Sequence, residues 1–293
     1  MTVERARPLL GTIVRVFVGG VAAAVAHRYI DAGFATIAEL HALMSFQEVG
    51  SDVSRLNREA AREAVTVSWH TYQVVRLALQ MSAASCGLFD ITTAARLVDD
   101  GQLPRPVDAP APHPAASWRD IELIEPDRIR FHRPLWIDLS GIAKGYAVDR
   151  AIERMANAND DESLIARVNA GGDLRVHGPW RDRALLRVPH HPPEQLPVIE
   201  IADGSLASSG AAPASLQPTQ SAARGSHLNG RTRERVDSMQ FVSVVAPLCA
   251  VADALTKVVL ADASASIEIL NQYRAAAFLF HARDGWRTLG CSD

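Results

Sequence analysis

The sequence contains no apolar run long enough to cross a membrane. A membrane-spanning helix needs about 20 consecutive apolar residues, and Arg, His, Asp or Glu interrupts every long apolar stretch of this chain. Glu4, Arg5 and Arg7 are followed by an alternating run at 13–18, where a signal peptide would have an apolar core. No cysteine lies near Met1 to accept a lipid. We expect a chain without a transmembrane segment that is cytoplasmic as written, and a leader removed earlier fits the same sequence.

Cysteine and excess positive charge are also scarce. The three cysteines are far apart and form no CxxC pattern, which argues against a disulfide framework or a thiolate zinc site. The 30 Lys and Arg residues are balanced by 33 Asp and Glu, for a net charge of −3. Such a chain has no overall positive field to attract nucleic acid or anionic lipid. Any phosphate-binding site must therefore be local.

The composition is that of a folded protein with a large core. Apolar residues make up 48% of the 293 residues and charged residues 22%, which are ordinary values for globular domains. Apolar residues recurring every three or four positions predict helices, and alternating ones predict strands. The helices predicted in this way cover 22–44, 51–56, 71–86, 145–155 and a last segment starting near 247. The predicted strands cover 13–18, 164–168 and 174–176, and further short strands lie on either side of a turn at 125–127.

Two stretches carry no such periodicity. Residues 103–117 contain five prolines among small residues, which predicts an exposed connector. Residues 189–226 are rich in Pro, Ala, Ser and Gln, and we expect them to be irregular. Because helices and strands mix without a regular βαβ alternation, the fold class expected is α+β, with largely antiparallel sheets packed against long helices.

The segment 138–149 joins a strand to a helix through a glycine-bearing turn. It reads Asp-Leu-Ser-Gly-Ile-Ala-Lys-Gly-Tyr-Ala-Val-Asp, with Lys144 at the start of the helix. Backbone N–H groups and the positive end of a helix then point to one spot, which suits a phosphate. The spacing lacks the ending of a Walker loop. The alternative is an ordinary tight turn with Lys144 in solvent.

Three further segments combine glycine or helical spacing with charge. Asp173 follows Gly171 and Gly172 directly after a strand, either as part of a ligand site or as the cap of a glycine bulge. Segment 87–92 reads Gly-Leu-Phe-Asp-Ile-Thr. Its ring and carboxylate could face a planar ligand; the alternative is a Phe in the core beside an Asp that caps a helix. Asp253 and Lys257 share one face of the last predicted helix, where an ordinary ion pair is the simpler explanation.

Taken together and in this order, these segments resemble the ApbE family, the FAD:protein FMN transferases. The family's Met-Gly-Thr is similar to residues 10–12, its serine-rich run to 51–57, and its GxFDxT, DLSxIAKGYAVD, NAGGD and ADAL segments are present at 87–92, 138–149, 169–173 and 252–255. The resemblance implies one ApbE-like domain over 1–293. It also implies a magnesium-dependent enzyme that splits the pyrophosphate of FAD and joins FMN through a phosphoester to a Thr or Ser of an acceptor flavoprotein, releasing AMP.

The resemblance also assigns roles to individual residues. Leu10 and Phe46 would form walls around the flavin or adenine. The remaining FAD contacts would be Leu88, Phe89, Asp90, Asp138, Lys144 and Asp173. The magnesium ion would sit on the backbone carbonyl of Gly141, on the carboxylate of Asp253, and on a hydroxyl four residues after that carboxylate. Oxygen ligands of this kind suit a hard cation that neutralises phosphate charge.

This chain departs from the family pattern in two places. Lys257 stands where the hydroxyl ligand is expected, and Thr256 comes one position early; an ammonium cannot coordinate a metal. Either Lys257 supplies positive charge itself or it pairs with Asp253 and weakens the site, and we expect a retained but altered site. The loop at 227–232 is shorter than in the family, yet it keeps His227, the candidate general base or phosphate contact.

The predicted catalytic residues are therefore Asp253, His227 and Lys257.

Two alternative functions use the same residues differently. A noncatalytic FAD-binding protein would hold FAD without releasing AMP. A metal-dependent FAD pyrophosphatase would use water in place of the acceptor and release FMN and AMP.

Overall fold

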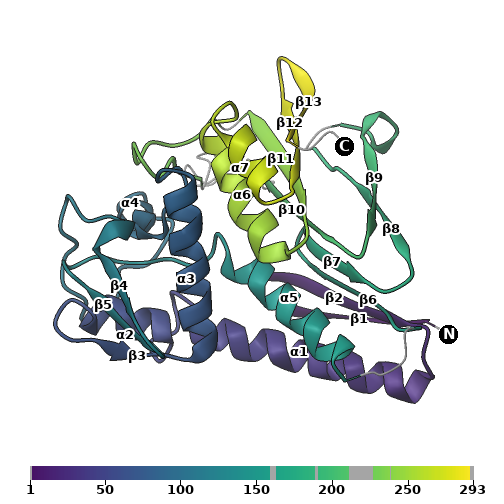
Figure 1. Ribbon diagram of the computed structural model, residues 1–293, viewed down its shortest axis with the longest axis horizontal. Coiled ribbons are helices and arrows are strands. Elements are labelled where there is room, and N and C mark those ends of the chain that lie inside the picture. The colour runs from purple at the N-terminus through teal and green to yellow at the C-terminus, as the bar shows by residue number, and fades with distance from the viewer. Residues whose placement is uncertain (1, 159–162, 189–190, 211–226, 238, 291–293) are drawn as a thin grey trace.

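The largest unit of the fold is an antiparallel sheet of eight strands. The computed structural model describes residues 2–158, 163–188, 191–210, 227–237 and 239–290 (Figure 1). The strand order is β1-β2-β6-β7-β10-β11-β12-β13. The strands are β1 (Thr2–Leu9), β2 (Thr12–Gly19), β6 (Ile165–Ala170), β7 (Asp173–His177), β10 (Ser205–Gly210), β11 (Gln240–Ala246), β12 (Ala276–His281) and β13 (Gly285–Gly290).

Helices cover one face of this sheet and bury its apolar side chains. They are α1 (Ala23–Met44), α5 (Ala143–Ala156), α6 (Cys249–Ala261) and α7 (Ser266–Gln272). In Figure 1 the long α1 runs beneath α5, and α6 lies beside α5. The alternation in β2 explains the arrangement, because Val14, Val16 and Val18 are fully buried under the helices while Ile13 is 52% exposed. On the opposite face, the hairpin of β8 (Arg181–Leu185) and β9 (Val198–Ala202) packs on a smaller apolar cluster.

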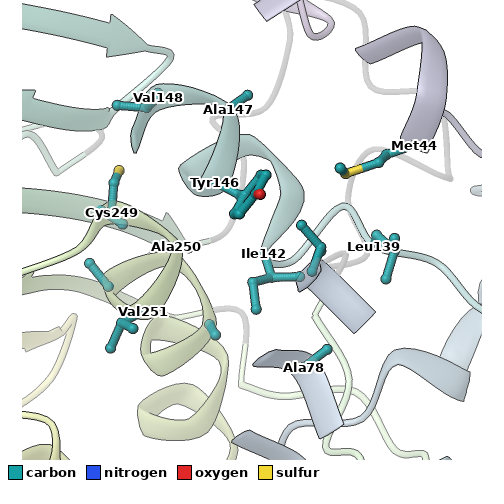
Figure 2. Packing of buried hydrophobic residues seen from close by; sticks show 14 of the residues in the cluster. Met44, Ala78, Leu139, Ile142, Tyr146, Ala147, Val148, Cys249, Ala250 and Val251 are labelled. Atoms are coloured by element: carbon teal, nitrogen blue, oxygen red, sulfur yellow. The ribbon is translucent and has the colours of Figure 1, made fainter. Parts of the chain in front are cut away.

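A second, smaller layer lies beside the helices and contains a three-stranded sheet of order β3-β5-β4. Its strands are β3 (Val65–Thr66), β4 (Ile121–Ile124) and β5 (Arg128–Phe131). Its helices are α2 (Asp52–Glu59), α3 (Trp69–Ala84), α4 (Ala94–Asp99) and the 3-10 turns η1 (Ile91–Thr93) and η2 (Trp118–Asp120). The two layers share one core. Figure 2 shows how Met44 of α1, Ala78 of α3, Tyr146 of α5 and Val251 of α6 come together there.

The α+β class and the long helices are confirmed. Ser51 caps α2, since its hydroxyl accepts a hydrogen bond from the Ser54 N–H at 3.0 Å. Residues 103–117 form no helix or strand. No helix in the described part of the chain is long and apolar enough to cross a membrane. The assignment of 1–293 to one domain stays a prediction.

The irregular structure predicted for 189–226 is wrong over most of 191–210, the part of that stretch that the structure describes. Residues 193–195 form η3 (Pro193–Gln195), and β9 and β10 follow. The sequence of β10, Ser-Leu-Ala-Ser-Ser-Gly, has no strand-like apolar pattern, and pairing with β7 and β11 on either side supplies its backbone partners. Residues 189–190 and 211–226 lie outside the described residues. Strand β1 was not expected, and α6 is not the last element, because α7, β12 and β13 follow it.

Candidate active site

Two adjoining cavities open around the first turn of α5. Each has a volume of about 370 Å³. We call them cavity A, next to α6, and cavity B, next to α1. They share Leu103, Asp138, Ser140 and Lys144. Lys144 therefore stands at the junction, within reach of a ligand that extends through both cavities.

Most of the predicted site residues line these cavities. Cavity A is lined by Leu88, Phe89, Asp90, Asp138, Gly141, Lys144, His227 and Lys257, among others. Leu10 and Phe46, the predicted walls for a ring system, line cavity B. Asp173 and Asp253 do not line either cavity and lie behind the two lysines. Residues from the beginning, middle and end of the chain thus line one cleft, while their individual roles stay predictions.

Each lysine of the cleft is paired with a buried aspartate. The ammonium of Lys144 lies 3.1 Å from Oδ2 of Asp173, whose side chain is 1% exposed. Lys257 is ion-paired with Oδ1 of Asp253, one turn earlier on α6, and the Asp253 side chain is 2% exposed. The backbone N–H of Gly145 donates to Oδ2 of Asp253 at 3.4 Å. The Lys144 ion pair thereby joins the first turn of α5 to β7, and the Gly145 hydrogen bond joins that turn to α6.

The ionisation of these groups follows from burial and from their neighbours. Burial raises the pKa of Asp173 to about 7, and the nearby charge of Asp253 adds to the effect. Burial also raises the pKa of Asp253, but Lys257 and Lys144 more than offset this and hold it below its usual value. Burial lowers the pKa of Lys144, yet Asp173 and Asp253 raise it above the usual range. Lys144 therefore keeps its positive charge facing both cavities near neutral pH.

A close helix crossing brings these residues together. A Cβ atom built on Gly145 would lie 2.4 Å from the carbonyl oxygen of Cys249, so only glycine permits this approach of α5 to α6. Asp149, one turn later on α5, accepts hydrogen bonds from the N–H groups of Cys249 and Ala250, each at 2.9 Å. It thereby caps α6 from the neighbouring helix, and Arg175 pairs with it at 2.7 Å.

The loop that carries His227 is fixed to the segment 87–92. Arg233 donates to Oδ2 of Asp90 at 2.8 Å, and the N–H of Gly230 donates to the carbonyl of Leu88 at 3.0 Å. Burial raises the pKa of Asp90, and the charge of Arg233 opposes this shift. Asp90 also caps η1 by accepting from the Thr92 N–H at 2.8 Å. Its carboxylate is thus already engaged in holding this wall of cavity A.

His227 and Asp138 are the titratable groups that face cavity A from its remaining sides. Burial and the charge of Lys257 lower the pKa of His227 to about 4, so its imidazole is neutral at pH 7. Desolvation raises the pKa of Asp138, although hydrogen bonds from Ser140 oppose the shift. The Ser140 hydroxyl donates to Oδ2 of Asp138 at 2.5 Å. This pair lies at the junction of the two cavities.

The residues at the expected magnesium site do not fit a magnesium ion. The ammonium of Lys257 already contacts Asp253, and a Cβ built on Gly141 would lie 3.5 Å from Cε of Lys257. The hydroxyl of Thr256 donates to the backbone carbonyl of Asp253 at 2.6 Å and is fully buried. Within the described ranges no three His, Cys, Asp or Glu side chains form a metal-binding group. An ammonium stands where the oxygen ligands of a hard cation would have to converge.

Some residues of the site were not predicted from the sequence. Ser140 orients Asp138, and Ser209 accepts a hydrogen bond from Lys257 at 3.2 Å. Arg233 and Asp149 hold the walls in place. Asp149 could have been recognised as a candidate in the sequence, because it ends the segment 138–149 that carries the family resemblance. Ser209 had none, because it lies in a serine-rich stretch without periodicity.

Sequence and structure comparisons relate this chain to known proteins. The ApbE family model matches residues 10–280. A FAD:protein FMN transferase of Vibrio cholerae serotype O1 is 28% identical over 185 residues, which is 59% of this chain and 54% of the relative. One of Haemophilus influenzae is 26% identical over 166 residues, which is 50% of this chain and 47% of the relative. The matched parts therefore span about half the length of these relatives.

Solved structures extend the similarity of the fold to nearly the whole chain. The ApbE protein of Thermotoga maritima superimposes with a TM-score of 0.84 at 21% identity, covering 98% of this chain and 96% of that one. The flavin transferase ApbE of Vibrio cholerae gives 0.78 at 21% identity, covering 100% and 97%. At such identities the likeness concerns the fold.

Proposed function

Because this chain belongs to the ApbE family, we propose that it transfers FMN from FAD to a Thr or Ser hydroxyl of an acceptor flavoprotein and releases AMP. The observation that carries the proposal is the meeting of Leu10, Phe46, segment 88–90, Lys144 and His227 around two joined cavities. FAD has two ring systems joined by a diphosphate. Two cavities with a lysine at their junction match that outline.

The reaction is a substitution at phosphorus. The acceptor hydroxyl oxygen forms a bond to the phosphorus of the FMN half, and the bond from that phosphorus to the oxygen bridging to AMP breaks. AMP leaves with that oxygen, and the proton of the hydroxyl must be taken up as the new bond forms. His227 lines cavity A and is neutral at pH 7, so one of its ring nitrogens can accept a hydrogen bond from that hydroxyl.

The remaining residues bind and orient. Lys144, held by Asp173, is positioned to neutralise the nonbridging phosphate oxygens. Phe46 and Leu10 offer apolar walls in cavity B, and Leu88 and Phe89 do so in cavity A. Magnesium, which the resemblance implies, supplies charge neutralisation in such reactions when it is bound. The groups around Asp253, an ammonium among them, argue against a magnesium ion at this site. The location of the protein in the cytoplasm stays a prediction.

One assay tests the proposal and separates it from the alternatives. The protein is incubated with FAD and a candidate acceptor domain, and the products are separated by mass spectrometry and nucleotide chromatography. We expect the acceptor to gain the mass of FMN with an equal amount of AMP. FAD that is bound and left intact would instead indicate a noncatalytic binding protein, the alternative that the Lys257–Asp253 pair favours. FMN and AMP released without an acceptor would indicate a pyrophosphatase.

A further inference from the structure

The only two lysines of this chain line the same cavity. Lys144 and Lys257 both face cavity A, and every other basic residue among the 30 Lys and Arg of the sequence is an arginine. The two side chains differ chemically, because an ammonium is a compact point charge with three donors whereas a guanidinium is a planar fork. A point charge resembles a small cation more closely than a guanidinium does.

The position of Lys257 is fixed by groups on three elements. Its ammonium is paired with Asp253 of α6 and donates to the hydroxyl of Ser209 on β10 at 3.2 Å. Its Cε atom lies beside Gly141, in the turn before α5. The Lys257 side chain is 16% exposed, and it reaches the cavity surface. The positive charge thus lies between Asp253 and Gly141, with one donor left for an anion beyond the two that Asp253 and Ser209 accept.

These observations describe a cation that is already built into the chain. We propose that the ammonium of Lys257 binds the diphosphate of FAD in place of a divalent metal, so that FAD binds, and FMN is transferred, without such an ion. This inference rests on the proposed function for the identity of the ligand. Lys257 takes up no proton in this role, and its ammonium donates a hydrogen bond to a phosphate oxygen.

The same geometry excludes a shared site for both cations. A divalent ion on Asp253 would lie within a few ångströms of the Lys257 ammonium, and like charges repel strongly in a partly buried site. The Thr256 hydroxyl is fully buried between the Asp253 carbonyl at 2.6 Å and the Ser209 hydroxyl at 2.8 Å, and it does not line cavity A. Binding of a metal would therefore require Lys257 to leave Asp253 and Ser209.

The first test measures FAD affinity by quenching of flavin fluorescence, in EDTA and in millimolar Mg²⁺. We expect the parent chain to bind FAD equally in both, within twofold. Lys257→Met, which keeps the length and removes the charge, should lose at least tenfold in affinity in EDTA, and Mg²⁺ should not restore it. Lys257→Thr should lose the same affinity in EDTA and regain at least tenfold with Mg²⁺. Far-UV circular dichroism of each variant checks that it is folded.

A matched control and a second readout complete the experiment. Lys144→Met keeps Lys257 and should bind FAD more weakly, yet equally in EDTA and Mg²⁺. In the parent chain itself, ¹³C labelling of the lysine side chains yields only two Cε resonances. FAD in EDTA should shift both, and Mg²⁺ alone should shift neither. A shift of the Lys257 resonance with Mg²⁺ alone would overturn the proposal without any variant.

The outcomes separate this proposal from the transfer function. Parent binding that tightens more than twofold with Mg²⁺, or a Lys257→Met variant with parental affinity, overturns the role of Lys257. If transfer stops in EDTA and returns with Mg²⁺, the enzyme is a transferase that needs the metal, and only the role of Lys257 fails. If FAD binding depends on Lys257 as described but no acceptor is labelled, the transfer function fails and the role of Lys257 in binding stands.

Discussion

Replacing Gly145 by alanine should separate two helices that carry the site. A Cβ atom at this position would lie 2.4 Å from the Cys249 carbonyl oxygen, 2.6 Å from its carbon and 2.8 Å from Cα of Ala250. All three contacts are with backbone, which cannot rotate away. To reach ordinary van der Waals distance, α5 and α6 must move apart by about 1 Å. That movement pulls Gly145 from Asp253, whose hydrogen bond is already long at 3.4 Å.

The expected loss of stability combines two opposing effects. Overpacking of a closed core costs about 1–3 kcal/mol, and a rigid backbone contact places this site near the upper end. Alanine in a helix is preferred over glycine by about 1 kcal/mol, which offsets part of that cost. We therefore expect Gly145→Ala to lower the free energy of unfolding by about 2 kcal/mol. FAD affinity should also fall, because Lys144 moves with the first turn of α5.

A second glycine provides the matched control. Gly33 lies inside α1, and a Cβ atom there would meet Met155 Sδ at 3.6 Å and Val16 Cγ1 at 3.7 Å, which are ordinary contacts. Gly33→Ala should raise the free energy of unfolding by about 0.5–1 kcal/mol. Both variants are measured by urea unfolding followed by far-UV circular dichroism. If Gly145→Ala is as stable as Gly33→Ala, the close helix crossing is not the constraint we infer.

Three further substitutions test the charges of the site. Asp149→Ala removes the acceptor that caps α6 and the nearer carboxylate partner of Arg175, which keeps Glu153 at 3.7 Å, so we expect a loss of about 2 kcal/mol in urea unfolding; an equal loss in Asp149→Asn, which keeps an oxygen to accept a hydrogen bond, would contradict this. Lys144→Met should weaken FAD binding at least tenfold by fluorescence while the chain stays folded, since Asp173, whose pKa is about 7, can take up a proton. His227 has a pKa of about 4 in the folded chain and 6.5 in the unfolded chain. Between these two pH values the unfolded chain holds a proton on His227 that the folded chain lacks, so the free energy of unfolding falls as the pH is lowered from 6.5 to about 4. Parent protein should therefore lose about 2 kcal/mol more than His227→Asn between pH 7 and pH 5, and equal losses would show that His227 is not buried in this way.

The local elements followed from local patterns. The three- and four-residue spacing in 22–44 was sufficient for α1, because one face of that helix is buried whatever covers it. The glycines at 171 and 172 predicted a break between strands, and they have φ angles of +64° and +109° at the turn from β6 to β7. In contrast, β10 is built from small residues whose strand conformation depends on its partners. Its place beside cavity A could not be predicted from its own sequence.

The order and chemistry of the segments at 87–92, 138–149, 169–173 and 252–255 were enough to indicate the family. The first three each include a turn or a helix start, and the fourth lies within α6. Tertiary structure alone decided how the charges are used. Gly145 and Asp253 are 108 residues apart in sequence and meet only because α5 and α6 cross, and Lys257 points to Ser209 and Gly141 rather than to solvent. Helical spacing fixes which residues share a face, but the neighbouring element determines which groups that face contacts. Electrostatic interactions depend on the distance between those groups, which only the packing of the elements sets.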